Sequence, residues 1–125
     1  HVELTTLVIP DHNDAPAELD EEARWIAGEV GPQTPVHLSA YSPRYKLQAP
    51  ATSAKTIVRA REILLRHLRH VYMGNVVTSE GADTICAQCG ATVVARQGYH
   101  TDTSGMKRDG ACAGCGADNH IVVAA

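Results

Sequence analysis

The chain has 125 residues, of which 44% are hydrophobic and 20% charged, so it can bury a core and extensive disorder is not expected. Its net charge of −3 argues against a general binder of nucleic acids or anionic membranes. No apolar run approaches the roughly 18–20 residues of a membrane span, and the first residues do not read as a signal peptide. We therefore expect a cytoplasmic protein, with neither membrane nor nucleic acid among its partners.

The first two thirds of the chain predict alternating strands and helices. Residues 4–9, 36–41 and 70–77 are rich in β-branched and apolar residues and read as strands. Asp14 is a good N-cap for a first helix, which Gly31 and Pro32 stop; Thr52 or Ser53 caps a second. The second helix is expected to bury Ile57, Ala60, Ile63, Leu64, Leu65 and Leu68. This β-α-β-α-β order favours parallel strands joined by right-handed crossovers.

The composition divides the chain into two domains. Residues 1–78 hold the predicted strands and helices, and residues 79–125 are rich in Cys, Gly and short apolar runs. Three parallel strands make a thin sheet, because parallel sheets are normally covered on both faces. The first domain therefore reads as the end of a larger sheet or barrel, and the chain as a piece of something longer.

The second domain contains two matching C-x-x-C-G turns. Their thiols belong to Cys86, Cys89, Cys112 and Cys115. Four thiolates in a tetrahedron suit zinc, and so small a unit needs such a metal to fold. The interval between the pairs has room for a β-hairpin, and residues 91–95 and 121–123 are expected to supply strands. Rubredoxin-like iron, disulfides and free thiols remain alternatives, as do His100 and His120 as competing ligands.

Other motifs carry less information. The chain has no P-loop, dinucleotide fingerprint, serine nucleophile elbow or H-E-x-x-H sequence. His37 lies within a predicted strand, where either a hydrogen-bonded structural role or a ligand contact is compatible with the sequence. The segment 72–75 ends a predicted parallel strand, and ligands of α/β proteins usually bind at that end.

Several collinear segments resemble one family, the radical SAM enzyme of the AmmeMemoRadiSam system, which is related to pyruvate formate-lyase activating enzymes. They are residues 7–14 (LVIPDHND), 36–43 (VHLSAYSP), 52–63 (TSAKTIVRAREI), 70–76 (HVYMGNV), 84–99 (TICAQCG to RQGY) and 109–116 (DGACAGCG). The resemblance covers nearly the whole chain in order, which is more specific than any single motif.

The resemblance implies a fold and an activity for a longer protein. The fold would be a partial (β/α)₆ barrel, of which residues 1–78 supply the last βαβαβ strands, followed by a small β-rich zinc ribbon at residues 79–125. The whole enzyme would bind a [4Fe–4S] cluster and cleave S-adenosylmethionine (SAM) reductively, and the resulting radical would abstract hydrogen from an unknown substrate. By the same resemblance, Val8, Ile9 and Pro10 would flank the adenine, and His37 would face the cofactor or substrate.

The sequence also departs from the family pattern. The C-x-x-x-C-x-x-C loop that binds the cluster is absent, because no cysteine precedes Cys86. Asp11 stands where the family has glycine, and Ala40 where it has arginine. The chain alone is therefore expected to be inactive. Its expected partners are the missing N-terminal barrel half and, by context, Memo-like and AMMECR-like proteins.

A reading from a different functional class stays open. A stand-alone zinc-ribbon module would join proteins or nucleic acid without catalysis. If residues 1–78 fold alone into a compact unit in solution, the module is favoured. If they expose apolar strand edges and aggregate, they are the remnant of a barrel.

Overall fold

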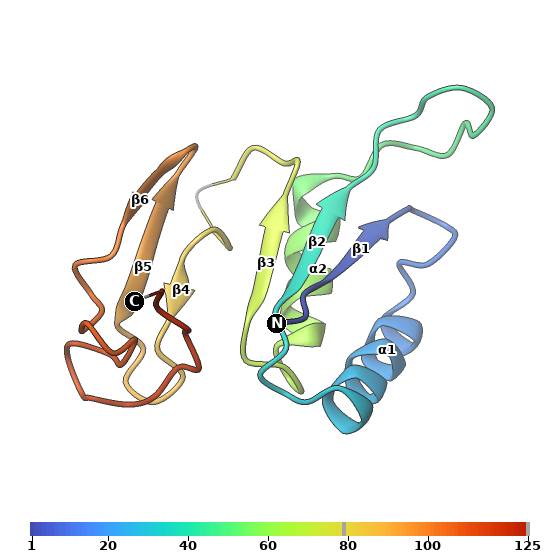
Figure 1. Ribbon diagram of the computed structural model, residues 1–125. Helices are drawn as coiled ribbons and strands as arrows, with labels where there is room; N and C mark the ends of the chain where they lie inside the picture. The colour runs from blue at the N-terminus through green and yellow to red at the C-terminus, as the bar shows by residue number, and fades with distance from the viewer. Residues whose placement is uncertain (79, 125) are drawn as a thin grey trace. The chain divides into compact units, whose positions relative to one another are not determined.

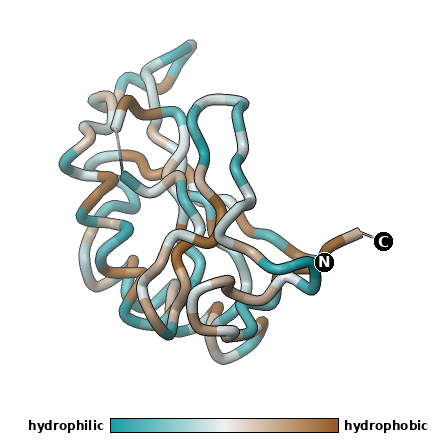
Figure 2. The backbone as a smooth tube through the Cα atoms, turned by 90° about the vertical axis from the view of Figure 1, so that its left-hand side faces the viewer, coloured by the Kyte–Doolittle hydropathy of each residue, from teal (hydrophilic) through white to brown (hydrophobic). Residues whose placement is uncertain are grey.

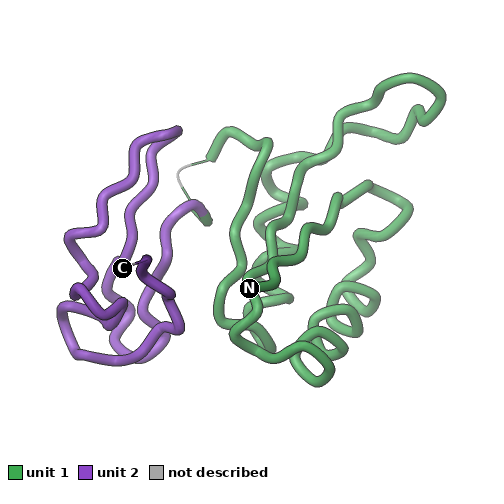
Figure 3. The backbone as a smooth tube through the Cα atoms, viewed as in Figure 1, with its two compact units in different colours: residues 1–81 green, residues 82–125 purple. Residues whose placement is uncertain are grey.

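The computed structural model describes residues 1–78 and 80–124. The chain divides into two compact units, His1–Gly81 and Ala82–Ala125 (Figure 3). The boundary predicted from composition, between residues 78 and 79, lies a few residues earlier. Within the described ranges no helix combines the length and apolar character needed to cross a bilayer.

Unit 1 is a three-stranded parallel sheet with two helices. Strands β1 (Leu4–Val8), β2 (Val36–Ala40) and β3 (Val71–Gly74) lie in the order β1-β2-β3. Helices α1 (Pro16–Glu29) and α2 (Ala54–Leu64) connect them (Figure 1). Because the chain crosses the sheet in one direction, right-handed crossovers place both helices on the same face. The βαβαβ order predicted from the sequence is confirmed.

The start of α1 differs from the prediction. Its N-cap is Ala15, which has no side-chain capping bond, and Pro16 opens the first turn. The Asp14 carboxylate instead accepts a hydrogen bond from the Asp11 N–H at 2.8 Å. The prediction of Asp14 as the cap was therefore wrong, because the preceding turn uses its side chain.

The start of α2 separates the two predicted caps. The Ser53 hydroxyl accepts from the Thr56 N–H at 3.1 Å and is the cap. Thr52 is buried and joins two strand ends, since its hydroxyl donates to the Val8 carbonyl and accepts from the Tyr41 N–H. Leu65 was wrongly placed in the apolar stripe and is 37% exposed, because it lies about 100° around the helix axis from the buried Leu64, on the side away from the core.

The core of unit 1 lies between the helices and one face of the sheet. Along β2, Val36, Leu38 and Ala40 are buried while His37 and Ser39 are partly exposed, as expected when alternate residues face opposite sides. The helices contribute Leu19, Ala23, Ile26, Ile57, Ala60, Ile63 and Leu64 to this core. The opposite face of the sheet has no helix of the described chain against it.

Unit 2 is a small antiparallel sheet with strand order β4-β5-β6. The strands are β4 (Thr84–Ile85), β5 (Thr92–Gln97) and β6 (His100–Asp102). The predicted strand at residues 121–123 was wrong: this apolar segment, near the brown C-terminal end in Figure 2, is irregular, and Val122 is 86% exposed. The third strand is β6, which folds back on β5 through Gly98 at φ 58°.

Candidate metal centre

The four cysteines converge in unit 2. Their Sγ atoms all lie within 4.8 Å of one another, and all four thiols are free. Two separations are 3.6 Å (Cys86 to Cys115) and 3.7 Å (Cys89 to Cys112). A tetrahedral ion with bonds of about 2.3 Å has ligands about 3.8 Å apart. The thiols therefore fit around one metal ion such as zinc, as their spacing predicted.

The two knuckles have the same backbone geometry. In each, the first cysteine donates its N–H to a carbonyl five residues on and accepts from the N–H of the glycine four residues on. The partners are Ala91 (2.8 Å) and Gly90 (2.9 Å) in the first knuckle, and Ala117 (2.9 Å) and Gly116 (2.8 Å) in the second. These glycines have φ angles of 74° and 77°, a region that side-chain-bearing residues rarely adopt. The turn geometry that the two knuckles share thus explains why both end in glycine.

The knuckle backbone also favours the thiolate form at the two buried sulfurs. The backbone N–H of Cys89 lowers the pKa of Cys86 to about 6, and that of Cys115 lowers the pKa of Cys112. At Cys89 the N–H of Ala91 acts in the same direction, but the neighbouring Cys115 and Cys86 sulfurs outweigh it and raise the pKa to about 12. Four adjacent thiolates repel one another, so a divalent cation at the centre relieves the conflict.

One further residue ties the knuckles together. Asn119 is buried; its Oδ1 accepts from the Ala87 N–H at 3.4 Å, and its Nδ2 donates to the Ala117 carbonyl at 3.1 Å. Sequence reasoning missed it, since a lone asparagine carries no spacing signal. The group of close metal-ligating atoms contains neither His100 nor His120. The four thiols alone therefore supply the candidate ligand set.

In unit 1, the residues predicted to line a cofactor pocket do not form one cluster. Val8 is fully buried in the core, so only its backbone can face a ligand, and its carbonyl already accepts from Thr52. Ile9 and Pro10 follow β1 at the carboxyl edge of the sheet. His37 lies on the opposite face from Val8, and its register partner is Thr5, about 10 Å along the strand from Val8 at roughly 3.3 Å per residue.

The turn after β1 is held by a side chain that sequence reasoning did not single out. Asn13 accepts from the Ile9 N–H at 2.7 Å through Oδ1 and donates to the Leu7 carbonyl at 2.9 Å through Nδ2. Asp11, in the same turn, has φ 63°. Aspartate is among the few residues besides glycine that tolerate this left-handed region, so an aspartate can occupy a turn position suited to glycine.

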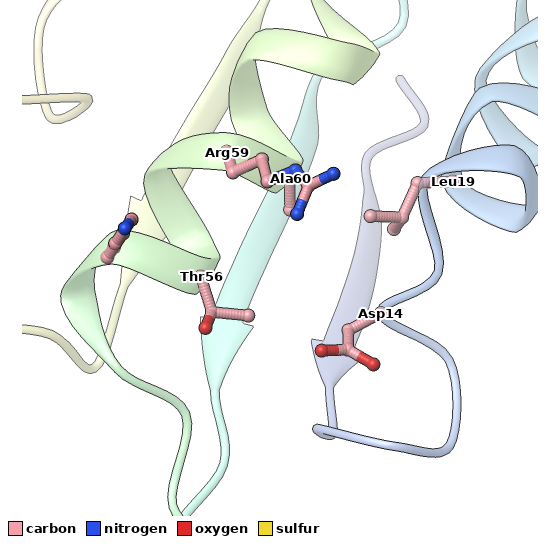
Figure 4. Close-up of a pocket in the computed structure, with 6 residues that line it drawn as sticks. Asp14, Leu19, Thr56, Arg59 and Ala60 are labelled. Carbon is pink, nitrogen blue, oxygen red and sulfur yellow. The ribbon is translucent and has the colours of Figure 1, made fainter.

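A separate small cavity lies between the start of α1 and α2. Its volume is about 130 Å³, and Asp14, Leu19, Lys55, Thr56, Arg59 and Ala60 line it (Figure 4). None of the predicted cofactor residues is among them. A carboxylate and two cationic side chains share the lining, so its charge is mixed.

Comparisons with known proteins give one similar sequence. An uncharacterized protein of the archaeon Methanocaldococcus jannaschii, MJ0808, is 38% identical over 97 residues, which are 76% of this chain. The matched stretch spans 29% of the length of that relative. No family model and no solved structure matches the chain.

Proposed function

We propose that the chain is the C-terminal part of a radical SAM enzyme of the AmmeMemoRadiSam type. In this proposal unit 1 supplies the last strands of a partial barrel and part of the SAM pocket, and unit 2 is a structural zinc ribbon. The substrate would lose a hydrogen atom to the radical formed from SAM. In the relative MJ0808, the similar stretch is likewise one part of a longer chain.

The observation that carries the proposal is that helices cover only one face of the unit 1 sheet. Three parallel strands pack helices on one face, and the other face presents Thr5, His37 and Tyr72 in one row. In a βα barrel the helices lie outside and the opposite sheet face lines the interior. A polar, aromatic row on the uncovered face is therefore suited to line a ligand site inside such a barrel.

The second support is the chemistry of the cysteines. A zinc ion would be bound by Cys86, Cys89, Cys112 and Cys115. It would stabilise the fold of unit 2 and take no part in the reaction of the substrate. The same sulfurs do not fit a [4Fe–4S] cluster, because a four-iron cube would hold its thiolates much farther apart than 4.8 Å. The chain has no other cysteines, so the cluster must be bound by residues outside it.

The experiment starts from the natural coding sequence upstream of His1. We expect the frame to continue for roughly 200 residues, typical of the first part of such a barrel, and to include a C-x-x-x-C-x-x-C loop. The anaerobically reconstituted full-length protein should release 5′-deoxyadenosine from SAM when reduced, whereas the 125-residue chain should not. The matched control replaces the loop cysteines by alanine in the full-length protein.

The rival function is a stand-alone zinc-ribbon module that binds a partner without catalysis. The self-contained knuckles of unit 2 favour it, since their ligands all come from residues 86–115. A start codon directly before His1, with a native mass near 13.3 kDa, would contradict the enzyme and make the module the leading function.

A further inference from the structure

His37 is held from two sides on the uncovered face of the unit 1 sheet. Its ring stacks on the ring of Tyr72, with centroids 5.2 Å apart and planes inclined by 26°. Its Nε2 lies 2.6 Å from Oε2 of Glu3. The stack follows from register, because His37 and Tyr72 are directly paired between β2 and β3. The imidazole is thus fixed by a neighbouring strand and by the segment that leads into β1.

The contact with Glu3 determines the roles of the two ring nitrogens. An ionised carboxylate can only accept hydrogen bonds, so Nε2 of His37 must be the donor. In a neutral imidazole the other nitrogen, Nδ1, is then the acceptor. In residues 1–78 and 80–124 no hydrogen bond to this Nδ1 is found, and the side chain is 40% exposed. The carboxylate also contacts His1, whose Nε2 lies 2.7 Å from Oε1.

We propose that Glu3 and Tyr72 are positioning residues that hold His37 so that its Nδ1 accepts a hydrogen bond from a ligand on the uncovered sheet face. The inference rests on the proposed function, because the ligand is then SAM or the substrate. The chemistry selects a donor group such as a hydroxyl, amide or ammonium. Neither Glu3 nor Tyr72 needs to touch the ligand; each acts by restricting the orientation of the imidazole.

Two variants separate the two restraints. Glu3→Ala removes the carboxylate, and Tyr72→Ala removes the stacking ring. Tyr72→Phe keeps the ring and should rescue the second effect. Glu29→Ala is the matched control, because it removes an exposed glutamate from the far end of α1.

The first measurement is made on the 125-residue chain by proton NMR with ¹⁵N-labelled histidine. An exposed imidazole N–H exchanges quickly with water, whereas one that donates to a carboxylate is retained. We expect a His37 Nε2–H resonance and a ring contact to Tyr72. The resonance should vanish in Glu3→Ala and persist in Glu29→Ala; the ring contact should vanish in Tyr72→Ala and persist in Tyr72→Phe.

The second measurement is SAM affinity by anaerobic calorimetry on the reconstituted full-length protein. Glu3→Ala and Tyr72→Ala should each weaken binding by roughly tenfold, the scale of one lost hydrogen bond, while Tyr72→Phe and Glu29→Ala bind like the parent. Unchanged resonance and affinity in Glu3→Ala would overturn the inference. If the Glu3-dependent resonance is present but the parent binds no SAM, the proposed function fails and the orientation of His37 stands.

Discussion

The two units of the chain are stabilised in different ways. In the described part of unit 1, thirteen buried hydrophobic residues form one core between the helices and the sheet. The corresponding core of unit 2 contains only Cys86, Val93, Val94 and Cys112. Half of that small core is made of metal-ligand candidates, so a metal bound in unit 2 would replace much of the apolar burial that stabilises unit 1.

This difference predicts which perturbation destabilises each unit. A unit with a hydrophobic core tolerates the loss of a metal elsewhere, because burial of apolar surface provides its stability. A small unit built on thiolates depends on deprotonated ligands and on the ion they share. Perturbations of the metal and of the core should therefore affect different parts of the same chain.

Removal of the metal should give the largest effect. Structural zinc contributes about 10–16 kcal/mol in zinc-finger peptides, so chelation, or Cys112→Ser, should unfold unit 2 and leave unit 1 folded. Residue-resolved amide NMR would show the collapse of dispersion for residues 82–124 alone, and mass spectrometry under native conditions would identify the ion. Red colour with bound iron would point to the rubredoxin-like alternative. Retention of unit 2 dispersion after complete metal loss would contradict the structural role.

A cavity in the core of unit 1 should give the next largest effect. Leu38 is fully buried in β2, so Leu38→Ala should lower the free energy of unfolding of unit 1 by about 2–5 kcal/mol. The metal content should stay the same. Leu7→Ala is the control, since Leu7 lies on the neighbouring strand and is 44% exposed. If chemical denaturation shows the same loss of unfolding free energy in both variants, the helix-facing side of the sheet is not the core.

Much of this comparison could be predicted from the sequence, because periodic patterns are local. The βαβαβ order and the cysteine knuckles follow from residue spacing, and both are found in the structure. The third strand of the ribbon could not be predicted, since residues 121–123 have high β-propensity and β6, with His100 and Asp102, has little. Strand pairing there depends on the hairpin at Gly98 and on tertiary contacts.

The arrangement of the side chains proposed for a ligand site in unit 1 was harder to predict for a similar reason. The sequence of β1 does not alternate cleanly between polar and apolar residues, so it does not show which side chains face the helices. In the structure Val8 lies in the core, whereas His37 lies on the opposite face of the sheet. Partners distant in sequence, such as Glu3 for His37, emerge only once the strands are placed in register.

Glycine substitutions should give smaller effects of opposite sign in the two units. A Cβ on Gly105 would lie 2.1 Å from the Thr92 carbonyl oxygen, so Gly105→Ala should destabilise unit 2 by about 1–3 kcal/mol through forced backbone shifts. A Cβ on Gly28 in α1 would meet nothing within 4 Å, so Gly28→Ala should stabilise unit 1 by about 0.5–1 kcal/mol. Chelator titration measures the change in unit 2 stability in Gly105→Ala, and thermal unfolding measures the change in unit 1 stability in Gly28→Ala. An unchanged stability of unit 2 in Gly105→Ala would contradict the close backbone approach.

The smallest effect should be the acid sensitivity of the contact between α1 and the segment that follows α2 in unit 1. The hydrogen bond from His67 at 2.8 Å, with Arg24 at 2.8 Å, lowers the pKa of Asp20 below its ordinary value of 3.8. A carboxyl whose pKa is lower in the folded state stabilises the fold above pH 3.8, and this contribution is lost as the pH falls through the folded value.

Asp20→Asn should therefore lower the stability of unit 1 at neutral pH and flatten its decline below pH 4. Urea unfolding of unit 1 between pH 3 and pH 7 measures the difference, with exposed Glu18→Gln as the control. Parallel pH profiles for Asp20→Asn and the parent would show that the carboxylate does not contribute to the packing of α1 against the segment after α2.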